Sequence, residues 1–317
     1  MSLSVVYSSD DTYAQHVGVS LISLLQNNNH FNTINIYLIE NNLSSYSKKN
    51  LNSICKKYNR TIQYINFNVL SDRLELNIGD SIAINSYARL FLASVIPEEL
   101  DKIIYLDCDS IINSSLSDLW NTDITEYFVA GVCDTVSNQT KFKIDMDKDD
   151  RYINAGMLLV NLKRWRTEKI EKQFIEFIDK YNGQVFHHDQ GVINGVLKGE
   201  VLYLHPKYNV MTPFFTMDRY EIMQYYGLQN YYSESELIEA IEVPVFIHYT
   251  PAFVNRPWVK GCRHPLTALY EEYLAMTPWK DTKPWKDRRG KGERIMSLLY
   301  NNLPFRVANR ICNFIFN

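Results

Sequence analysis

The fold is decided by one stretch, Lys102-Ile103-Ile104-Tyr105-Leu106-Asp107-Cys108-Asp109. Its apolar part predicts a buried strand, although periodicity alone does not distinguish such a run from a helical segment. In an open α/β sheet, ligands bind in the crevice at the carboxyl ends of the strands. Asp107 and Asp109 are two residues apart, so they point the same way from an extended backbone. The pair suits a hard divalent cation that keeps positions open for phosphate oxygens; the alternative is a strand end with two loop acids.

Strand and helix patterns alternate along the chain before this stretch. Strands are predicted at residues 3–9, 34–39 and 61–67, with a helix after each of the first two. Ser44 is the predicted N-cap of the second helix. The first strand ends at an aspartate, and no Gly-x-Gly-x-x-Gly follows it. This favours a nucleotide-binding half-fold over its dinucleotide-binding version.

The rest of the chain continues this pattern without an internal repeat or a Gly/Ser-rich linker. It predicts further strands at 127–133, 201–204 and 243–247, and helices at 81–95, 164–181, from 187 onward and near 264–276, with an apolar run at 157–160 before the second of these helices. Asp134 follows the strand at 127–133, and the polar segment 135–151 comes next. A segment of this length without a predicted element is usually functional or mobile. We expect one α/β domain of about 280 residues.

Composition limits the classes of protein that fit the sequence. The chain has 317 residues, of which 46% are hydrophobic and 13% aromatic, so a sizeable globular core is expected. The net charge of −3 argues against nucleic acid as the main partner. Five scattered cysteines form no Cys-x-x-Cys pair, so neither a zinc site nor a disulfide framework is indicated. No signal-peptide pattern and no run of about 18 apolar residues is present, so we expect a cytoplasmic protein.

Residues 280–317 differ electrostatically from the rest of the chain. They carry nine Lys or Arg residues and three acids, a net charge of +6 that leaves −9 for residues 1–279. Many apolar side chains accompany these charges, and Leu303-Pro304 would separate two short helices. We expect a basic amphipathic helical appendage that attaches the protein peripherally to the anionic inner face of the cell membrane. The alternative is a solvated basic stretch that only raises solubility.

Six sequence blocks, taken in order, are more specific than any single motif. They are Ser9-Asp10-Asp11-x-Tyr13, Tyr87-x-Arg89-Leu90, Tyr105-Leu106-Asp107-x-Asp109, Asn154-Ala155-Gly156-x-x-Leu159-x-Asn161-Leu162-x-x-Trp165, Asp189-Gln190, and His248-Tyr249 with Pro257-Trp258. This order resembles the retaining glycosyltransferases of family 8. That group includes bacterial lipopolysaccharide galactosyl- and glucosyltransferases and, more distantly, glycogenin. The resemblance extends over roughly residues 3–280.

The resemblance implies a GT-A fold, an α/β nucleotide-sugar-binding fold with a mixed central sheet, over residues 1–279. It also implies a UDP-sugar donor whose two phosphates are bridged by a cation on Asp107, Asp109 and His248. Two carboxylates and one imidazole suit Mn²⁺ best, with Mg²⁺ as the alternative. Taken alone, His248 would be interpreted as a structural histidine.

Further residues are implied to contact the donor. Asp10 would accept a hydrogen bond from the uracil N–H, with Tyr13 near the base or the ribose. Arg89 and Asp189 would contact the donor hexose, and Asn154 would line its reactive face. The plainer interpretation makes Asp10 a turn residue and Arg89 the partner of a nearby acid.

Retention of the anomeric configuration requires either a nucleophile on the opposite face of the sugar or same-face attack by the acceptor. Gln190, which would line the same reactive face, is the family's residue nearest the nucleophile position. An amide is a poor nucleophile, so we favour same-face attack, with Asp189 or Asp134 as candidate contributors to catalysis.

The sequence departs from the family pattern at two places. Thr12 stands where Asn is common, which weakens one expected uracil contact. The usual Gly and Lys-Pro-Trp after His-Tyr are replaced by the longer segment 250–258, which lacks the glycine and has Arg256 in place of the lysine. Arg256 could contact a diphosphate through two hydrogen bonds. The altered segment leaves the donor geometry open.

The leading interpretation is a retaining, metal-dependent hexosyltransferase. It would move galactose or glucose from a UDP-sugar to a glycan or lipid-linked saccharide during synthesis of bacterial surface polysaccharide or lipopolysaccharide. A nucleotide-sugar-binding protein without efficient turnover is one alternative, because segment 250–258 is altered. A phosphohydrolase with Asp107 as nucleophile is the other, but such enzymes usually carry the motif on their first strand.

Overall fold

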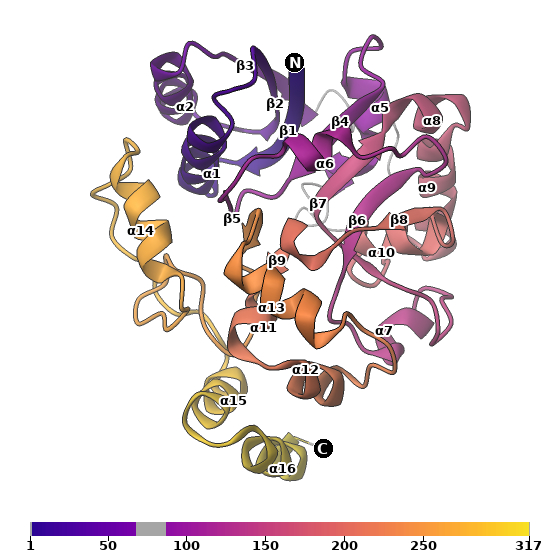
Figure 1. Cartoon of the computed structure of the whole chain (residues 1–317), viewed down its shortest axis with the longest axis vertical. Helices are drawn as coiled ribbons and strands as arrows, with labels where there is room; N and C mark the ends of the chain where they lie inside the picture. The colour runs from indigo at the N-terminus through magenta and orange to yellow at the C-terminus, as the bar shows by residue number, and fades with distance from the viewer. Residues whose placement is uncertain (1, 68–86, 317) are drawn as a thin grey trace.

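We describe the protein from a computed structural model that defines residues 2–67 and 87–316 (Figure 1). A seven-stranded sheet has the order β3-β2-β1-β4-β7-β6-β8. Its strands are β1 Ser2–Asp10, β2 Thr33–Asn41, β3 Ile62–Asn66, β4 Lys102–Leu106, β6 Val129–Cys133, β7 Ile153–Asn161 and β8 Val201–Tyr203. β7 is antiparallel to β4 and β6, and the other neighbours are parallel, so the sheet is mixed as predicted. The carboxyl ends of β1, β4, β6 and β8 therefore share one edge with the amino end of β7.

Alternate strand residues supply a core on each face of the sheet. Val5 and Tyr7 of β1 belong to the first core and Val6 to the second, as the two-residue period of a strand requires. The first core is covered by α1 Ala14–Asn27, α2 Ser45–Lys57 and α14 Thr267–Ala275. The second is covered by α8 Leu162–Thr167, α9 Ile170–Lys180 and α10 His188–Val196. Ser44 caps α2 by accepting a hydrogen bond from the Ser47 backbone, as predicted.

A second sheet of three short strands brings the histidine of the last sequence block close to the two acids of the third block. Its order is β5-β10-β9, with β5 Ser110–Ile112, β9 Val210–Met211 and β10 Phe246–His248. β5 follows Asp109 directly, and the antiparallel pairing of β10 with β5 sets His248 opposite Ser110. This register brings His248 beside the two acids, although it is far from them in the sequence.

Two predicted helices differ from the structure. The helix expected over 164–181 is divided into α8 and α9, because Lys169 between them has a left-handed φ of 52°. The helix expected over 81–95 lies partly outside the described residues. Within them the chain forms a 3-10 turn, η1 Ala88–Phe91, and a short helix, α5 Leu92–Val95.

The polar segment after β6, residues 135–151, packs against the second core. It contains α7 Asn138–Phe142, and Val136, Ile144 and Met146 are buried in the second core. Sequence reasoning missed this helix because polar residues dominate the segment. The remaining short elements are α6 Ser117–Asn121, η2 Pro206–Tyr208, α11 Thr212–Thr216, α12 Arg219–Tyr226 and α13 Glu234–Glu242.

Two helices end the chain, α15 Lys291–Asn302 and α16 Phe305–Phe316, with the predicted break between them. Figure 1 shows them at one end of the molecule, close to α12. The ring of Tyr300 on α15 lies 5.6 Å from the ring of Tyr225 on α12. Earlier residues of the same segment contact the sheet domain, because Trp285 forms a bridge with Val259.

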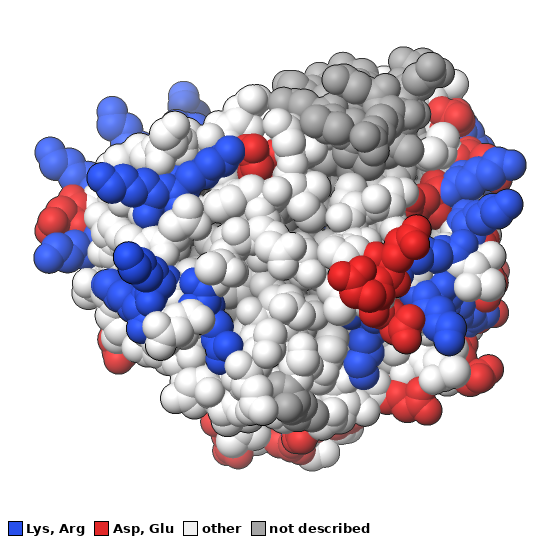
Figure 2. Space-filling view, turned by 90° about the horizontal axis from the view of Figure 1, so that it is seen from above, with Lys and Arg blue, Asp and Glu red and all other residues white. Residues whose placement is uncertain are grey.

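Surface charge is mixed on the face drawn in Figure 2. Lys and Arg side chains lie toward its sides, Asp and Glu lie among them, and an uncharged area separates the groups. The described part of this face therefore has no continuous basic surface of the kind that nucleic-acid binding requires.

Candidate active site

The three predicted metal ligands lie together at the edge of the main sheet. Nε2 of His248 is 3.2 Å from Oδ1 of Asp109 and 3.6 Å from Oδ2 of Asp107. The three ligand atoms lie within 4.8 Å of one another. Burial opposes charge on both groups, yet the pKa of His248 is raised and that of Asp109 is lowered, because the two attract each other. Two carboxylate oxygens and one imidazole nitrogen at this spacing fit a divalent cation.

Asn209 orients the histidine, and sequence reasoning missed it. Asn154 Oδ1 accepts from the Gly156 N–H at 2.9 Å, so the Asn209 amide must turn its Nδ2 toward that oxygen, at 2.9 Å. Oδ1 of Asn209 then faces Nδ1 of His248, at 3.2 Å. An oxygen only accepts, so Nδ1 carries the hydrogen and Nε2 is left for a metal. Asn209 belongs to no motif, so the sequence gives no signal for it.

Gly156 allows the backbone of β7 to approach the predicted metal ligands. A Cβ at this position would lie 2.1 Å from Cε1 of His248 and 2.9 Å from Oδ2 of Asp107. No real Cβ approaches other atoms so closely, so a larger residue would displace the ligands. The glycine of the Asn-Ala-Gly block is therefore required by packing.

Arg89 connects the metal site to the residues expected at the donor hexose. Its guanidinium lies 2.9 Å from Oδ1 of Asp107 and 2.7 Å from Oδ2 of Asp189, and it donates to the Ala155 carbonyl at 2.5 Å. The ring of Tyr105 lies beneath it at 4.3 Å. Burial raises the pKa of Asp189 to about 6, although the charge of Arg89 opposes this. Arg89 and Asp189 therefore form a buried pair, as the plainer interpretation allowed.

The three candidate catalytic residues lie close to one another. Asp134 Oδ2 accepts from Nε2 of Gln190 at 2.8 Å and from Nδ2 of Asn154 at 3.0 Å. Oε1 of Gln190 accepts from the Ala155 N–H at 3.0 Å. Both ends of the Gln190 amide are therefore held, and its orientation is fixed.

Asp10 and Tyr13 lie at the carboxyl end of β1, next to β4. Oδ1 of Asp10 accepts from the Tyr13 backbone N–H at 3.1 Å. The centres of the Tyr13 and Trp285 rings are 5.8 Å apart, and the two rings are nearly perpendicular. Both residues thus occupy the same sheet edge as the metal ligands, separated from them by one strand spacing.

Comparison with known proteins decides the family. The family model for glycosyl transferase family 8 matches residues 4–262. The chain belongs to glycosyl transferase family 8. The phosphohydrolase alternative therefore has no support.

Similar members of family 8 include bacterial enzymes. A putative glycosyltransferase of Haemophilus influenzae is 30% identical over 83% of this chain and 75% of its own length. A lipopolysaccharide 1,2-glucosyltransferase of Escherichia coli (strain K12) is 27% identical over 89% of this chain and 80% of its own. The galactosyltransferase LgtC, solved with donor and acceptor sugar analogues, superposes with a TM-score of 0.71 at 24% identity, covering 87% of this chain and 96% of LgtC. The predicted GT-A fold is confirmed.

Segment 250–258, in which this chain departs from the usual family pattern, still places a positively charged side chain at the site. Nη2 of Arg256 lies 3.1 Å from Oδ2 of Asp109, and Nε donates to the Tyr249 carbonyl at 3.0 Å. Arg256, which stands in place of the family's lysine, thus lies beside the predicted metal ligands.

Helix α15, near the C-terminus, contacts segment 250–258 and holds it in place. The ring of Phe253 stacks on Tyr300 at 3.8 Å and an angle of 13°. The Phe253 carbonyl accepts hydrogen bonds from Nδ2 of Asn301 at 2.9 Å and from the Ser297 hydroxyl. Sequence reasoning treated residues 280–317 separately and did not foresee this contact. None of the described helices is both long and apolar enough to cross a membrane.

Proposed function

We propose that this chain transfers a hexose, galactose or glucose, from a UDP-sugar to a saccharide or lipid-linked saccharide, with retention of configuration. The acceptor would belong to bacterial surface polysaccharide or lipopolysaccharide. One observation carries the proposal. Arg89 contacts both Asp107, one of the three proposed metal ligands, and Asp189, which is expected at the donor hexose. Lipopolysaccharide transferases among the relatives support the acceptor class.

The metal ligands fit Mn²⁺, with Mg²⁺ as the second choice. Asp107, Asp109 and His248 would hold it, and Asn209 keeps the imidazole in the tautomer that a metal requires. A bound cation supplies Lewis-acid stabilisation of the charge that develops on the departing diphosphate. Arg256 lies close enough to Asp109 to add a second positive charge there.

The chain's own residues would bind and orient the donor. Asp10 at the end of β1 would accept from the uracil N–H, with Tyr13 beside the base or ribose. Arg89 and Asp189 would contact the hexose as a fixed pair, 2.7 Å apart. Asn154 would line the reactive face, where its amide is held by Asp134.

The contacts of Gln190 favour same-face attack by the acceptor. Its Oε1 already accepts from the Ala155 N–H, and its Nε2 donates to Asp134. An amide held in this way positions groups near the anomeric carbon better than it attacks that carbon. A covalent sugar adduct trapped on Gln190, Asp189 or Asp134 would contradict this mechanism.

The C-terminal helices provide an apolar surface suited to membrane attachment. Ala308 and Cys312 of α16 are buried, whereas Val307, Phe314 and Ile315 are 46%, 90% and 53% exposed. With the basic residues of 280–317, this surface would bind anionic lipid and keep the protein peripheral on the cytoplasmic face. We retain 1–279 and 280–317 as the proposed division into transferase domain and attachment segment.

Vesicle sedimentation tests the attachment. The double substitution Phe314→Ser with Ile315→Ser should reduce binding to phosphatidylglycerol vesicles. Ile238→Ser, on α13 and 47% exposed, is the matched control and should bind as the unaltered chain does. Equal binding by all three proteins would contradict the attachment.

UDP release tests the transferase proposal. Release from UDP-galactose or UDP-glucose should require Mn²⁺, stop with chelator, and be abolished by Asp109→Asn in a folded protein. Binding of UDP-sugars without any release would favour the alternative of a nucleotide-sugar-binding protein. Full activity of Asp109→Asn would mean that the metal site is assigned wrongly.

A further inference from the structure

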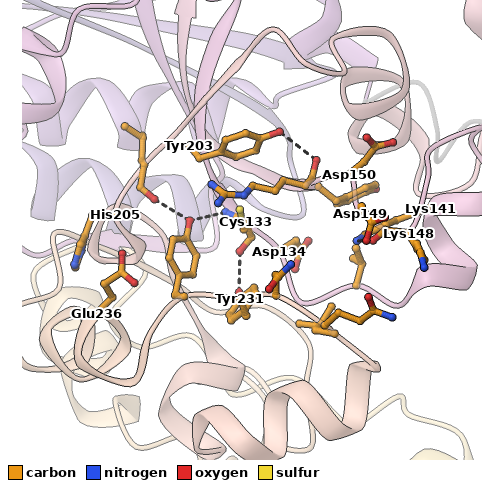
Figure 3. A pocket seen from close by; sticks show the side chains of 18 residues that line it. Cys133, Asp134, Lys141, Lys148, Asp149, Asp150, Tyr203, His205, Tyr231 and Glu236 are labelled. Carbon is orange, nitrogen blue, oxygen red and sulfur yellow. Dashed lines mark hydrogen bonds between the residues drawn. The ribbon is translucent and has the colours of Figure 1, made fainter.

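A cavity of about 430 Å³ opens at the carboxyl ends of β6 and β8 (Figure 3). Asp134, which follows β6, lines it together with Tyr203 at the end of β8. Figure 3 shows Tyr203 and Tyr231 on opposite sides, with Cys133 and Asp134 between them. A volume of this size is typical of small-molecule sites. None of the donor-binding roles proposed above uses this cavity.

The aromatic walls of the cavity are fixed by hydrogen bonds to the backbone. The Tyr231 hydroxyl donates to the Cys133 carbonyl at 2.8 Å. The Tyr232 hydroxyl accepts from the Cys133 N–H at 2.9 Å and donates to the Leu204 carbonyl at 2.8 Å. Both hydroxyls are therefore engaged, and the rings remain as rigid apolar surfaces. Such surfaces suit the C–H face of a pyranose ring.

Polar groups of both signs surround these rings. The Arg151 guanidinium lies over the Tyr203 ring at 4.9 Å, and within the described residues neither Arg151 nor Lys148 forms an ion pair with an acid. Asp150, in contrast, is paired with Lys198 at 2.6 Å. Arg151 and Lys148 are therefore free to bind hydroxyls or an acidic substituent. Rigid rings with charged and polar groups at their edges suit a sugar better than a purely apolar ligand.

The order of strands places the cavity on the side of the site away from β1. Along the shared edge, Asp10 ends β1, the two acids of the predicted metal site follow β4, Asn154 lies on β7 and Asp134 follows β6. The cavity comes next, at β6 and β8, farthest from the expected uracil position. Asp134 belongs to both regions, because its Oδ2 also accepts from Asn154 and Gln190.

We propose that this cavity binds a saccharide unit of the acceptor beyond the unit that receives the hexose. Tyr203, Tyr231 and Tyr232 would contact the sugar ring, and Arg151 with Lys148 would bind its hydroxyls or an acidic group. The assignment of this sugar to the acceptor rests on the proposed transferase function. A cavity shaped for one saccharide unit selects among acceptors that share the same terminal sugar.

Saturation-transfer NMR with four disaccharides tests the proposal: lactose, maltose, cellobiose and cellobiouronic acid. At least one should bind the full-length protein, and Arg151→Gln and Tyr203→Leu should each weaken its binding by roughly fivefold to tenfold, the effect of one lost stacked or hydrogen-bonded contact. Arg306→Gln is the matched control, because Arg306 also lies over a tyrosine ring, that of Tyr220 at 5.4 Å. It should bind as the unaltered protein does.

The outcomes separate this proposal from the proposed function. No binding of any of the four sugars, or unchanged affinity in both variants, would overturn the cavity assignment. If Tyr203→Leu proves unstable by thermal melting, Arg151→Gln alone decides. Equal affinity for cellobiose and cellobiouronic acid, or preference for the acid, both support the site and distinguish recognition of hydroxyls from recognition of charge. If UDP-galactose and UDP-glucose are neither bound nor cleaved while Arg151-dependent sugar binding persists, the transferase proposal fails and the saccharide site stands.

Discussion

Replacement of Gly156 by Ala tests the metal-site geometry most directly. The new Cβ would lie 2.1 Å from Cε1 of His248, whereas nonbonded carbons approach to about 3.5 Å. The imidazole or the β7 backbone must therefore move by more than about 1 Å. Gly156 does not have a positive φ, so Ala introduces no backbone strain of its own. Overpacking of this kind should lower the free energy of unfolding by roughly 1–3 kcal/mol. A displacement of the proposed metal ligands by about 1 Å should weaken Mn²⁺ binding by roughly a hundredfold.

The assay is a titration of Mn²⁺ followed by electron paramagnetic resonance, with thermal melting on the same samples. Gly131→Ala on β6 is the matched control. Its Cβ would meet the end of the Ile153 side chain at 3.0 Å and that of Leu158 at 3.3 Å, both of which can yield. Gly131→Ala should melt slightly earlier and bind Mn²⁺ normally. A folded Gly156→Ala protein with unchanged Mn²⁺ affinity would refute the proposed ligand set.

Three further predictions follow from other contacts. Asn209→Ala frees the metal-site histidine from its partner and should weaken Mn²⁺ affinity by roughly ten- to a hundredfold, measured by the same titration. Burial lowers the pKa of His264 to about 4, so the unfolded chain binds more protons between pH 4 and 6.5. The free energy of unfolding should therefore fall by about 2 kcal/mol between pH 7 and pH 5, and urea titrations should lose this part of the pH dependence in His264→Phe. Tyr300→Ala removes the ring stacked on Phe253 and so loosens segment 250–258, which carries Arg256. The donor KM should rise by roughly threefold to tenfold, with little effect on the melting temperature. An unchanged KM would mean that α15 does not position this segment.

Most of the fold could be predicted because its elements are defined by local apolar runs. Strands at 3–9, 34–39 and 127–133 all appear within a few residues of their predicted bounds. The Asp107/Asp109 pair was predictable for the same reason, since a strand end is a local feature. Helix breaks were less predictable, because the left-handed Lys169 that divides α8 from α9 carries no glycine or proline signal.

The site was predictable only as far as motifs extend. The family resemblance connected His248 to the two acids, but their contact depends on the pairing of β10 with β5. Asn209 could not be found from the sequence, because its role arises from packing against His248 and Asn154. The cavity beside Asp134 was equally hidden, since its walls come from β8 and from the turn after α12.

The Asn154-Ala155-Gly156 block explains how one site is assembled from distant parts. β7 is the antiparallel strand of the main sheet, so its first residues meet the carboxyl ends of its neighbours. There the Ala155 carbonyl accepts from Arg89 and the Ala155 N–H donates to Gln190, so one residue of the strand holds both side chains. The adjacent glycine leaves room for the proposed metal ligands, and the adjacent Asn154 donates to Asp134, which lines the cavity. Because these contacts share three consecutive residues of a buried strand, a shift of β7 would disturb the proposed cation, donor and acceptor positions together.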